Sequence, residues 1–562
     1  MFSRIPRIFV SASIALLFLV VCTTLYLYDD APVYHATGNL QVPTSKVEGH
    51  WGQPGQGVAF QDVKGDSASV TAHIDPAASS TVSASTSSPP TDGSDKPPAT
   101  GQGHVEKPEQ GAEPEKDLGH RPGQSTAARP PETGCPADAQ FLIRAATKQE
   151  LTDRVRYTRS CIEPVFSAKV DRDEVVNISE PIFKGATELD MLDCSDIQLP
   201  ECSSVKLTVP NPYPKGDYAH LIFGIATSYE RLNDSVPAFA HWLSGTGSKL
   251  IASVTDIQEK TSTEMGYLQD EFRAGGIDAV MVKPLDPEFK TSENHFGVLK
   301  NMVEYSGPET QWFALLDDDT FFPNLKPLSD ALAKLDHTKD AYVGTLSEDF
   351  SSIRNWGYMA FGGAGAYLSA PLAVKLAEKV FECIKDSSFS EGDILIRECV
   401  YTNSKAKLTI MPGLYQQDIQ GDPSGFFEAG LRPINLHHWK SWFEAPVIAM
   451  AKAADFCGDC FLQRWRFGND TVLSNGYSIA TYRDGLETVD LTTLEGTFDK
   501  SNGDFDFSIG PFRKPYSKKR KKSYKLLDAE ITQRGDLRQL YVWKGNETLG
   551  ELDEVVEMIW RK

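Results

Sequence analysis

The stretch Trp312-Phe313-Ala314-Leu315-Leu316-Asp317-Asp318-Asp319-Thr320 decides the fold, because it places three consecutive carboxylates directly after a run of apolar residues. The apolar run predicts a strand buried on both faces, which is typical of parallel sheets. Ligands of open α/β sheets bind at the carboxyl ends of such strands. Three adjacent carboxylates repel one another unless a cation lies among them, and their oxygen atoms suit Mn²⁺ or Mg²⁺ together with phosphate. We therefore expect a divalent metal and a phosphate to meet here, rather than a solvated acidic turn.

Strands and helices alternate on both sides of this stretch. The predicted strands cover residues 220–226, 249–254, 279–282 and 341–344, and the predicted helices cover residues 294–305, 325–335 and 371–381. This order predicts an α/β fold with a mostly parallel, Rossmann-like sheet. The first strand is not followed by Gly-x-Gly-x-x-Gly, and the sequence has no Walker loop, which argues against dinucleotide-binding and P-loop proteins.

Length and composition divide the chain and exclude one class of partner. A chain of 562 residues is too long for one ordinary domain. The segment from about residue 30 to 134 is dominated by Ser, Thr, Pro, Gly, Ala and Asp, so it is expected to be a disordered stem. The net charge of -21 argues against nucleic acid as a partner, since binding a polyanion relies on concentrated Lys and Arg. An acidic chain can still bind an anionic nucleotide where a metal bridges the two.

The N-terminal segment has the features of a membrane anchor. Residues 8–28 are uncharged and mostly apolar, close to the roughly 20 residues that a helix needs to cross a bilayer. Arginines precede this run and aspartates follow it, so the positive-inside rule keeps residues 1–7 in the cytosol and translocates the rest. A cleaved signal peptide would have a shorter apolar core, of about 7 to 15 residues, and a small-residue cleavage site. We therefore expect an anchor.

Glycosylation sequons and cysteines fit a secretory lumen. The sequon asparagines are Asn177, Asn233, Asn469 and Asn546, and the cysteines after the apolar run are Cys135, Cys161, Cys194, Cys202, Cys383, Cys399, Cys457 and Cys460. An even number of cysteines in an oxidising compartment predicts disulfides. The close pair Cys457 and Cys460 is expected to form a local disulfide or two bridges to other parts of the chain. No second pair at finger spacing accompanies it, as a zinc site would need.

Three further segments carry candidate site residues. Gly362-Gly363-Ala364-Gly365 allows close approach of the backbone to a ligand or to a neighbouring element. Ser390-Glu391-Gly392-Asp393 begins a helix, where a carboxylate can be a base or simply a cap. Leu436-His437-His438-Trp439 offers two imidazoles, and most histidines are not ligands, although imidazole suits a borderline metal such as Mn²⁺.

Taken in order, these segments resemble the Fringe and core 1 β-1,3-galactosyltransferase group of glycosyltransferases, in its divergent fungal and plant branch. The resemblance rests on residues 312–322 with Asn324-Leu325, on residues 362–369, on Gly392-Asp393 and on Leu436-His437-His438, in matching order over residues 218–450. It implies a GT-A fold, a UDP-sugar donor, Mn²⁺ in preference to Mg²⁺, and inversion at the anomeric carbon.

The resemblance also implies a metal site. Asp319 is implied as a metal ligand, with Asp317 and Asp318 supporting the metal and the donor. One of His437 and His438 is implied as the distant ligand. We favour His438, because the Fringe pattern has the later histidine, whereas the core 1 pattern would favour His437.

The same resemblance assigns the base and the donor contacts. Asp393 is implied as the general base, and Cys383 and Cys399, which bracket it, are implied to form a disulfide. The residues implied to contact the donor are Thr227, Arg231, Asp256, Gly363 and Gly365, with Asp256 where such enzymes hold the uracil. Fringe has Pro-Asp-Asp where this chain has Glu391-Gly392-Asp393, so only the last carboxylate carries over.

The resemblance predicts an inverting, metal-dependent glycosyltransferase that transfers a sugar from a UDP-sugar to a glycan or glycoprotein, in β-1,3 linkage. The alternative is a catalytically inactive lumenal glycan-binding protein that retains the fold, but such a protein needs no base. A metal-dependent phosphohydrolase would need more carboxylates or histidines for a two-metal site.

The expected organisation is that of a single-pass type II Golgi membrane protein with a lumenal head. The expected boundaries are 1–7 cytosolic tail, 8–28 anchor, 29–134 stem, 135–217 disulfide-tied lead-in, 218–450 GT-A domain and 451–562 β-rich extension. The expected partners are the UDP-sugar, the acceptor and, through the anchor, the membrane.

Overall fold

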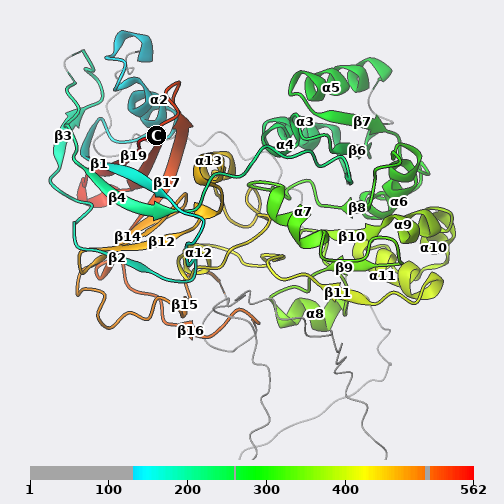
Figure 1. Ribbon diagram of the computed structural model, residues 1–562. Helices are drawn as coiled ribbons and strands as arrows, with labels where there is room; N and C mark the ends of the chain where they lie inside the picture. The colour runs from blue at the N-terminus through cyan, green and yellow to red at the C-terminus, as the bar shows by residue number, and fades with distance from the viewer. Residues whose placement is uncertain (1–130, 196, 258–260, 500–506) are drawn as a thin grey trace, which may run out of the picture. The chain divides into compact units, whose positions relative to one another are not determined.

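The computed structural model describes residues 131–195, 197–257, 261–499 and 507–562 (Figure 1). All of them belong to the second of the two units into which the chain divides, Gln53–Lys562. The anchor expected at residues 8–28, and the stem as far as residue 130, lie outside the described residues. Among the helices that are described, none combines the length and the apolar character needed to cross a membrane.

A seven-stranded sheet is built from the segment that the sequence predicts as α/β. Its strands, in spatial order, are β11 (Leu408–Ile410), β9 (Tyr342–Gly344), β10 (Ala366–Ser369), β8 (Trp312–Leu315), β5 (Leu221–Thr227), β6 (Lys249–Val254) and β7 (Asp278–Val282). All neighbouring strands are parallel except β10, which runs antiparallel to both β8 and β9. The prediction of an α/β fold with a mostly parallel sheet is confirmed.

Helices follow the strands and bury both faces of this sheet. The helices of this segment are α3 (Tyr229–Asp234), α4 (Val236–Leu243), α5 (Ser262–Ala274), α6 (Thr291–Glu304), α7 (Lys326–Leu332), α8 (Phe350–Trp356), α9 (Ala370–Ala377), α10 (Val380–Asp386) and α11 (Gly392–Asn403). Trp312 and Ala314 of β8 belong to one core with residues of α4, α5 and α7. Phe313 and Leu315 belong to another with α6, α9 and α11. Burial on both faces explains why this strand is a continuous apolar run.

The helix predicted at residues 371–381 is two helices in the structure. The break lies at Lys379, whose N–H donates to the carbonyl of Leu376, a tighter turn than the α-helical one. The chain then turns into α10, and Val380 and Ile384 enter the core shared with α6 and α11. Tertiary packing therefore overrides a helical pattern that is continuous in sequence.

A second, ten-stranded sheet joins two segments that the sequence analysis treats separately. Its spatial order is β2 (Val176–Ile178), β12 (Arg464–Phe467), β13 (Thr471–Ser474), β14 (Ser478–Tyr482), β17 (Lys521–Ile531), β18 (Leu537–Trp543), β19 (Asp553–Trp560), β1 (Arg154–Phe166) and β3 (Thr187–Asp190), with β4 (Ser204–Val209) also paired to β1. Strands from the lead-in, β1 and β2, run parallel to strands from the C-terminal extension, β19 and β12. The lead-in and the extension thus share one sheet.

The remaining elements are short connections and covers. They are η1 (Glu132–Gly134), α2 (Gln140–Lys148), α12 (Ser424–Glu428), α13 (Val447–Cys457), η3 (Gly458–Cys460), β15 (Leu494–Glu495), β16 (Phe512–Arg513) and η4 (Glu547–Leu549). Helix α13 packs against β17 and, through Met450 and Ala453, belongs to the same core as Phe223 of β5. The core therefore continues from one sheet to the other.

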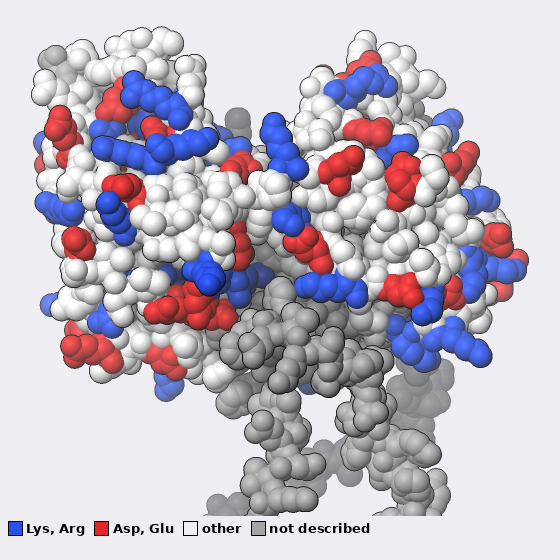
Figure 2. Space-filling view, viewed as in Figure 1, with Lys and Arg blue, Asp and Glu red and all other residues white. Residues whose placement is uncertain are grey.

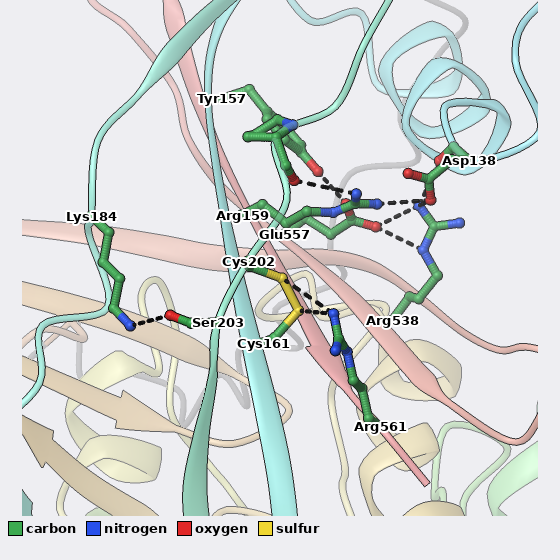
Figure 3. Close-up of a disulfide and its surroundings, with 11 residues drawn as sticks. Asp138, Tyr157, Arg159, Cys161, Lys184, Cys202, Ser203, Arg538, Glu557 and Arg561 are labelled. Atoms are coloured by element: carbon green, nitrogen blue, oxygen red, sulfur yellow. Dashed lines mark hydrogen bonds and ion pairs between the residues drawn. A yellow bond between two sulfur atoms is a disulfide. The ribbon is translucent and has the colours of Figure 1, made fainter.

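A buried ionic cluster ties the two segments of the ten-stranded sheet. Glu557 of β19 is fully buried and accepts hydrogen bonds from Arg159 of β1 at 3.0 Å and from Arg538 of β18 at 2.7 Å. Figure 3 shows these two guanidinium groups converging on Glu557, with Tyr157 on the same carboxylate. Because the carboxylate has several donors, its burial is compensated.

Four disulfides stabilise the described chain. They join Cys135 to Cys194, Cys161 to Cys202, Cys383 to Cys399 and Cys457 to Cys460. The predicted Cys383–Cys399 bond, which links α10 to α11, is confirmed, as is the local bond at Cys457. Figure 3 shows Arg561 beside the Cys161–Cys202 bond, its guanidinium 3.2 Å from the Cys161 Sγ. The four sequon asparagines are all exposed.

Candidate functional site

The acidic stretch lies at the carboxyl edge of the seven-stranded sheet, as its position after β8 predicts. Strands β5 and β8 are parallel, so Thr227 at the end of β5 lies beside the carboxylates. Its Oγ1 donates to Asp318 Oδ2 at 2.5 Å, and Arg231 Nε of α3 donates to the same oxygen at 2.6 Å. Asp318 is therefore held by two donors that the sequence analysis assigns to the nucleotide.

The carboxylate of Asp256, which lies just after β6, accepts a hydrogen bond from the backbone. Its Oδ1 accepts the N–H of Tyr229, the first residue of α3, at 2.9 Å. This bond fixes the loop between β5 and α3 against the end of β6. The structure thus places Thr227, Arg231 and Asp256 around one loop at the sheet edge.

Asp319 and the two histidines form a potential metal centre. Among the residues that the structure describes, Asp319, His437 and His438 each offer a ligand atom, and these atoms all lie within 4.8 Å of one another. His437 Nε2 lies 3.2 Å from Asp319 Oδ1, whereas His438 Nδ1 lies 3.9 Å from Asp319 Oδ2. The hydroxyl of Ser441 donates to Asp319 at 3.1 Å.

The His437 ring is oriented for metal binding. Its Nδ1 lies 2.6 Å from the carbonyl oxygen of Gln416, and its backbone N–H donates to the Gln417 side chain at 2.6 Å. An Nδ1–H that donates to a carbonyl leaves Nε2 as the ligand atom, the usual arrangement of metal-binding histidines. Nε2 also lies 3.4 Å from Asp317 Oδ2.

His438 is held less directly toward the acids. Its backbone has a φ of 58°, its Nε2 lies 3.2 Å from Asp418 Oδ1, and its ring stacks on Trp442 at a centroid distance of 3.9 Å. Although the sequence analysis favours His438 as the ligand, the distances to Asp319 favour His437.

The charges at this centre fit a cation. Burial lowers the pKa of His437, but its hydrogen bonds to Asp317 and Asp319 outweigh burial and hold this pKa well above the usual value. Burial raises the pKa of Asp319, but the hydrogen bond from His437 and the charges of His437, His438 and Lys440 together outweigh burial and hold this pKa well below its usual range. A positive charge therefore belongs among these carboxylates, and Mn²⁺ with its oxygen and imidazole ligands fits the donor set.

Asp393 lies on the other side of the glycine-rich turn. It is the second residue of α11, and its Oδ2 accepts the N–H of Gly362 at 2.8 Å. Burial raises the pKa of Asp393 to about 6, against the opposing charge of His295. A carboxylate with such a pKa is a stronger base than an ordinary aspartate and is still ionised at neutral pH.

His295 is a candidate that the sequence analysis misses. It lies in the first turns of α6, with Nδ1 3.9 Å from Asp317 Oδ1 and Nε2 3.7 Å from Asp393 Oδ1. The residue is buried, and its Nε2 has no hydrogen-bond partner among the described residues. The one signal in sequence is indirect. A helix that follows a parallel strand begins at the carboxyl edge, so its first turns face the ligand site.

The turn needs glycines because its backbone lies very close to neighbouring side chains. A Cβ at Gly362 would lie 2.8 Å from Asp393 Oδ1 and 3.0 Å from Asp317 Oδ1, and a Cβ at Gly363 would overlap the His437 ring. Gly365 has a φ of +97°, which favours glycine. The turn therefore packs between Asp393, the acidic stretch and His437.

A cleft of about 740 Å³ opens at this edge and is lined by His295, Asp317, Asp393 and His438, with Trp356 and Trp442. The cleft thus combines carboxylates, imidazoles and tryptophans. Elsewhere on the surface, Figure 2 shows that, on the face in view, basic and acidic side chains of the described residues are interspersed rather than gathered in a single patch.

Glu348 holds the loop that orients His437, and the sequence gives no sign of this role. Its side chain is buried and accepts the backbone N–H groups of Gln416 and Gln417, each at 2.8 Å. Burial, together with Asp418, raises the pKa of Glu348 to about 8. Glu348 thereby holds the loop whose carbonyl and side chain orient His437.

We expect Glu348→Ala to weaken Mn²⁺ binding by about 10- to 100-fold, the usual effect of removing a residue that orients a metal ligand. Calorimetric titration of Mn²⁺ measures the change, and the exposed Glu378→Ala is the matched control. A Glu348→Ala protein that unfolds at the wild-type temperature and binds Mn²⁺ as tightly would contradict this role.

Comparison with known proteins gives one family match. Residues 354–452 match the family described as "Protein of unknown function, DUF604". The matched segment contains the glycine-rich turn, Asp393 and both histidines. Comparison with curated protein sequences gives no match.

The similar solved structures include two glycosyltransferases and a synthase. The mannosyltransferase PcManGT from Pyrobaculum calidifontis, in complex with GDP-Man and Mn²⁺, is 9% identical over 34% of this chain and 56% of that chain, with a TM-score of 0.23. Mouse xyloside xylosyltransferase 1 is 9% identical over 32% and 79%, with a TM-score of 0.22. The 4-diphosphocytidyl-2C-methyl-D-erythritol synthase of Anaerococcus prevotii is 11% identical over 34% and 86%, with a TM-score of 0.23. Likenesses at these TM-scores carry no argument about activity.

Proposed function

We propose that this protein is an inverting, metal-dependent glycosyltransferase of the GT-A fold. It transfers a sugar from a UDP-sugar to a hydroxyl of a glycan or glycoprotein, in β-1,3 linkage. One observation carries the proposal: the candidate base and the acidic stretch flank the same residue, since a Cβ at Gly362 would lie 2.8 Å from Asp393 Oδ1 and 3.0 Å from Asp317 Oδ1. A base and a metal site this close can act on the two sides of one anomeric carbon.

The donor side is formed by the sheet edge. Asp319 and His437 would hold Mn²⁺, with His438 and Asp317 beside them. When bound, the metal stabilises the charge of the departing diphosphate as a Lewis acid. The loop fixed by Asp256, together with Thr227, would bind the nucleotide. The backbone of the glycine-rich turn at Gly363, where a Cβ would overlap the His437 ring, and at Gly365 would contact the donor beside the metal.

The acceptor side is formed by Asp393. Its Oδ2 is held by the N–H of Gly362, so Oδ1 is the atom that takes the proton from the acceptor hydroxyl. The acceptor oxygen forms its bond to the anomeric carbon as the bond to UDP breaks, which inverts the configuration. His295 lies 3.7 Å from Oδ1 and would orient it.

The cellular setting belongs to the same proposal. We place the protein in the Golgi membrane as a single-pass type II protein with its head in the lumen, held by residues 8–28. Four disulfides and four exposed sequon asparagines support an oxidising, glycosylating compartment.

The test is a donor screen on the full-length protein in detergent. UDP-sugars and, for contrast, GDP-mannose are titrated with Mn²⁺ or with EDTA, and UDP release is measured with a panel of glycan acceptors. We expect at least one UDP-sugar to bind only with Mn²⁺ and to be turned over. Metal-dependent binding without turnover on any acceptor would instead favour the inactive glycan-binding protein, and binding that is equal in EDTA would contradict the metal site.

A further inference from the structure

A second cavity is lined by strands of the ten-stranded sheet. Its volume is about 770 Å³, and none of its described lining residues lines the cleft that contains Asp393. It is formed by β17, β18 and the loops next to them, and four lysines line it: Lys518, Lys521, Lys525 and Lys544. We call this cavity the lysine pocket. A cavity of this size is typical of sites that bind a small ligand.

The lysine pocket belongs to a basic segment of an acidic chain. The 13 residues from Arg513 to Lys525 include eight Lys and Arg and no Asp or Glu, whereas the whole chain has 56 Lys and Arg against 77 Asp and Glu. An anion is therefore repelled by most of the protein and attracted to this segment.

Lys518 and Lys525 are the lysines of the pocket that are most open to a ligand. Lys518 is exposed, and within the part of the chain that the structure describes its ammonium group has no ion pair. Lys525 Nζ lies 2.8 Å from Asp422 Oδ1, but the two side chains are 49% and 40% exposed. Ion pairs that are so accessible to water contribute little, so an incoming anion can take the place of Asp422.

Lys521 has a different role, because its charge is already compensated. It is buried, and its Nζ donates to Glu428 Oε2 at 2.5 Å and to Glu495 Oε2 at 3.0 Å. A buried pair of this kind is costly to break. Lys521 therefore fixes one wall of the pocket, and the binding of an anion is left to the exposed lysines.

Aromatic and hydroxyl side chains also line the pocket. Trp543 and Tyr516 provide the aromatic rings, and Ser523 and Thr497 provide hydroxyls. A pyranose ring has an apolar face of C–H groups and a rim of hydroxyls, so it matches this combination of side chains. An acidic peptide would use the lysines alone. The lining therefore favours a sugar that carries a negative charge.

We propose that the lysine pocket binds an anionic saccharide, in which a sugar ring carries a carboxylate or a sulfate group. Lys518 and Lys525 bind the anionic group, and the ring packs in the part of the pocket lined by Trp543. The site requires neither a nucleotide-sugar nor a metal, and it shares no lining residue with the Asp393 cleft. The inference therefore goes beyond the proposed function and does not rest on it.

The test is calorimetric titration of the full-length protein in detergent, at 0.15 M salt, with EDTA and without any UDP-sugar. Four probes are compared: trigalacturonate, sulfated maltotriose, maltotriose and a hexaglutamate peptide. Asn546 of a glycosylation sequon also lines the pocket, so N-glycans are first trimmed with an endoglycosidase. Trigalacturonate and sulfated maltotriose distinguish a carboxylate from a sulfate as the anionic group.

We expect at least one of the two anionic saccharides to bind, and maltotriose and hexaglutamate to bind at least about tenfold more weakly. Lys518→Glu should weaken binding of the anionic saccharide by at least about tenfold, because an attractive charge becomes a repulsive one. Lys519→Glu makes the same change at an adjacent exposed residue that does not line the pocket, and Lys405→Glu makes it in the loop after α11. Both should bind within about threefold of the wild type, since salt at this concentration screens charges beyond about 8 Å.

Three results would overturn the inference. They are the absence of binding by either anionic saccharide, binding of hexaglutamate with equal affinity, and equal losses in Lys518→Glu and Lys519→Glu. None of them bears on sugar transfer, because the titrations contain no donor and no metal. Failure of the proposed function would show instead in the donor screen with Mn²⁺.

Discussion

Asp319→Ala is expected to lower metal-dependent sugar transfer by about a thousandfold or more. A Lewis-acid metal contributes several kcal/mol to stabilising a leaving group, and about 1.4 kcal/mol corresponds to a factor of ten in rate. Asp319 carries this effect because it is the carboxylate nearest to His437 Nε2, at 3.2 Å. The measurement is kcat as a function of Mn²⁺ concentration, together with Mn²⁺ binding by electron paramagnetic resonance.

The neighbouring carboxylate provides an informative comparison. Asp318 is held by Thr227 and Arg231, so Asp318→Ala should disturb the β5–α3 loop and donor affinity more than it disturbs Mn²⁺ affinity. Asp386→Ala, at an exposed position on α10, controls for the loss of a charge. If Asp319→Ala folded normally and bound Mn²⁺ as tightly as the wild type, the metal would have to lie elsewhere.

Asp393→Asn is expected to lower kcat by about 10²- to 10⁴-fold, the usual contribution of a general base, while Mn²⁺ and donor binding persist. The amide cannot take the proton from the acceptor, but it can still accept the N–H of Gly362. Measuring the transfer rate and, separately, the binding of the UDP-sugar distinguishes a loss of catalysis from a loss of donor binding. Loss of donor binding in parallel with kcat would show a structural role instead.

The same residue predicts a pH profile. A base acts only when it is deprotonated, and burial raises the pKa of Asp393 to about 6, so activity should rise with pH through about 6. For stability the sign is opposite. A raised pKa in the folded state favours the protonated form, and the stability that this form contributes is lost as pH rises through about 6. The Asn variant should therefore lack the rise in activity and be no less stable than the wild type at pH 7.

Much of the seven-stranded sheet could be predicted from sequence because its strands are buried on both faces. The prediction for β6, residues 249–254, matches Lys249–Val254, and the acidic stretch follows β8 as expected. Such apolar runs predict a strand clearly, and the order of strands and helices predicts that the acidic stretch lies at the carboxyl edge of the sheet. The break between α9 and α10 could not be predicted, because it depends on which core receives Val380 and Ile384.

The candidate site could be predicted where residue type and spacing carry chemistry. Asp319, Asp393 and the histidine pair belong to segments with such patterns. The structure groups Asp319 with both histidines, and His438 and Asp393 line the same cleft. His295 and Glu348 carry no local pattern, since a histidine in a helix and a glutamate in a loop are ordinary. Their positions arise only when α6 and the loop at residues 416–418 fold against the sheet edge.

The pairing of β1 with β19 has a consequence for the synthesis of the chain. The two strands are parallel neighbours, although Arg156 and Glu554 are 398 positions apart. During translation β1 emerges long before its partner, so the edge of β1 that pairs with β19 stays open until β19 has been made. A ribosome that stalls or terminates before Asp553 would release a chain in which β1 and β18 both present open edges, and open edges invite pairing between molecules. Quality control of nascent chains should therefore act most strongly on products that lack β19.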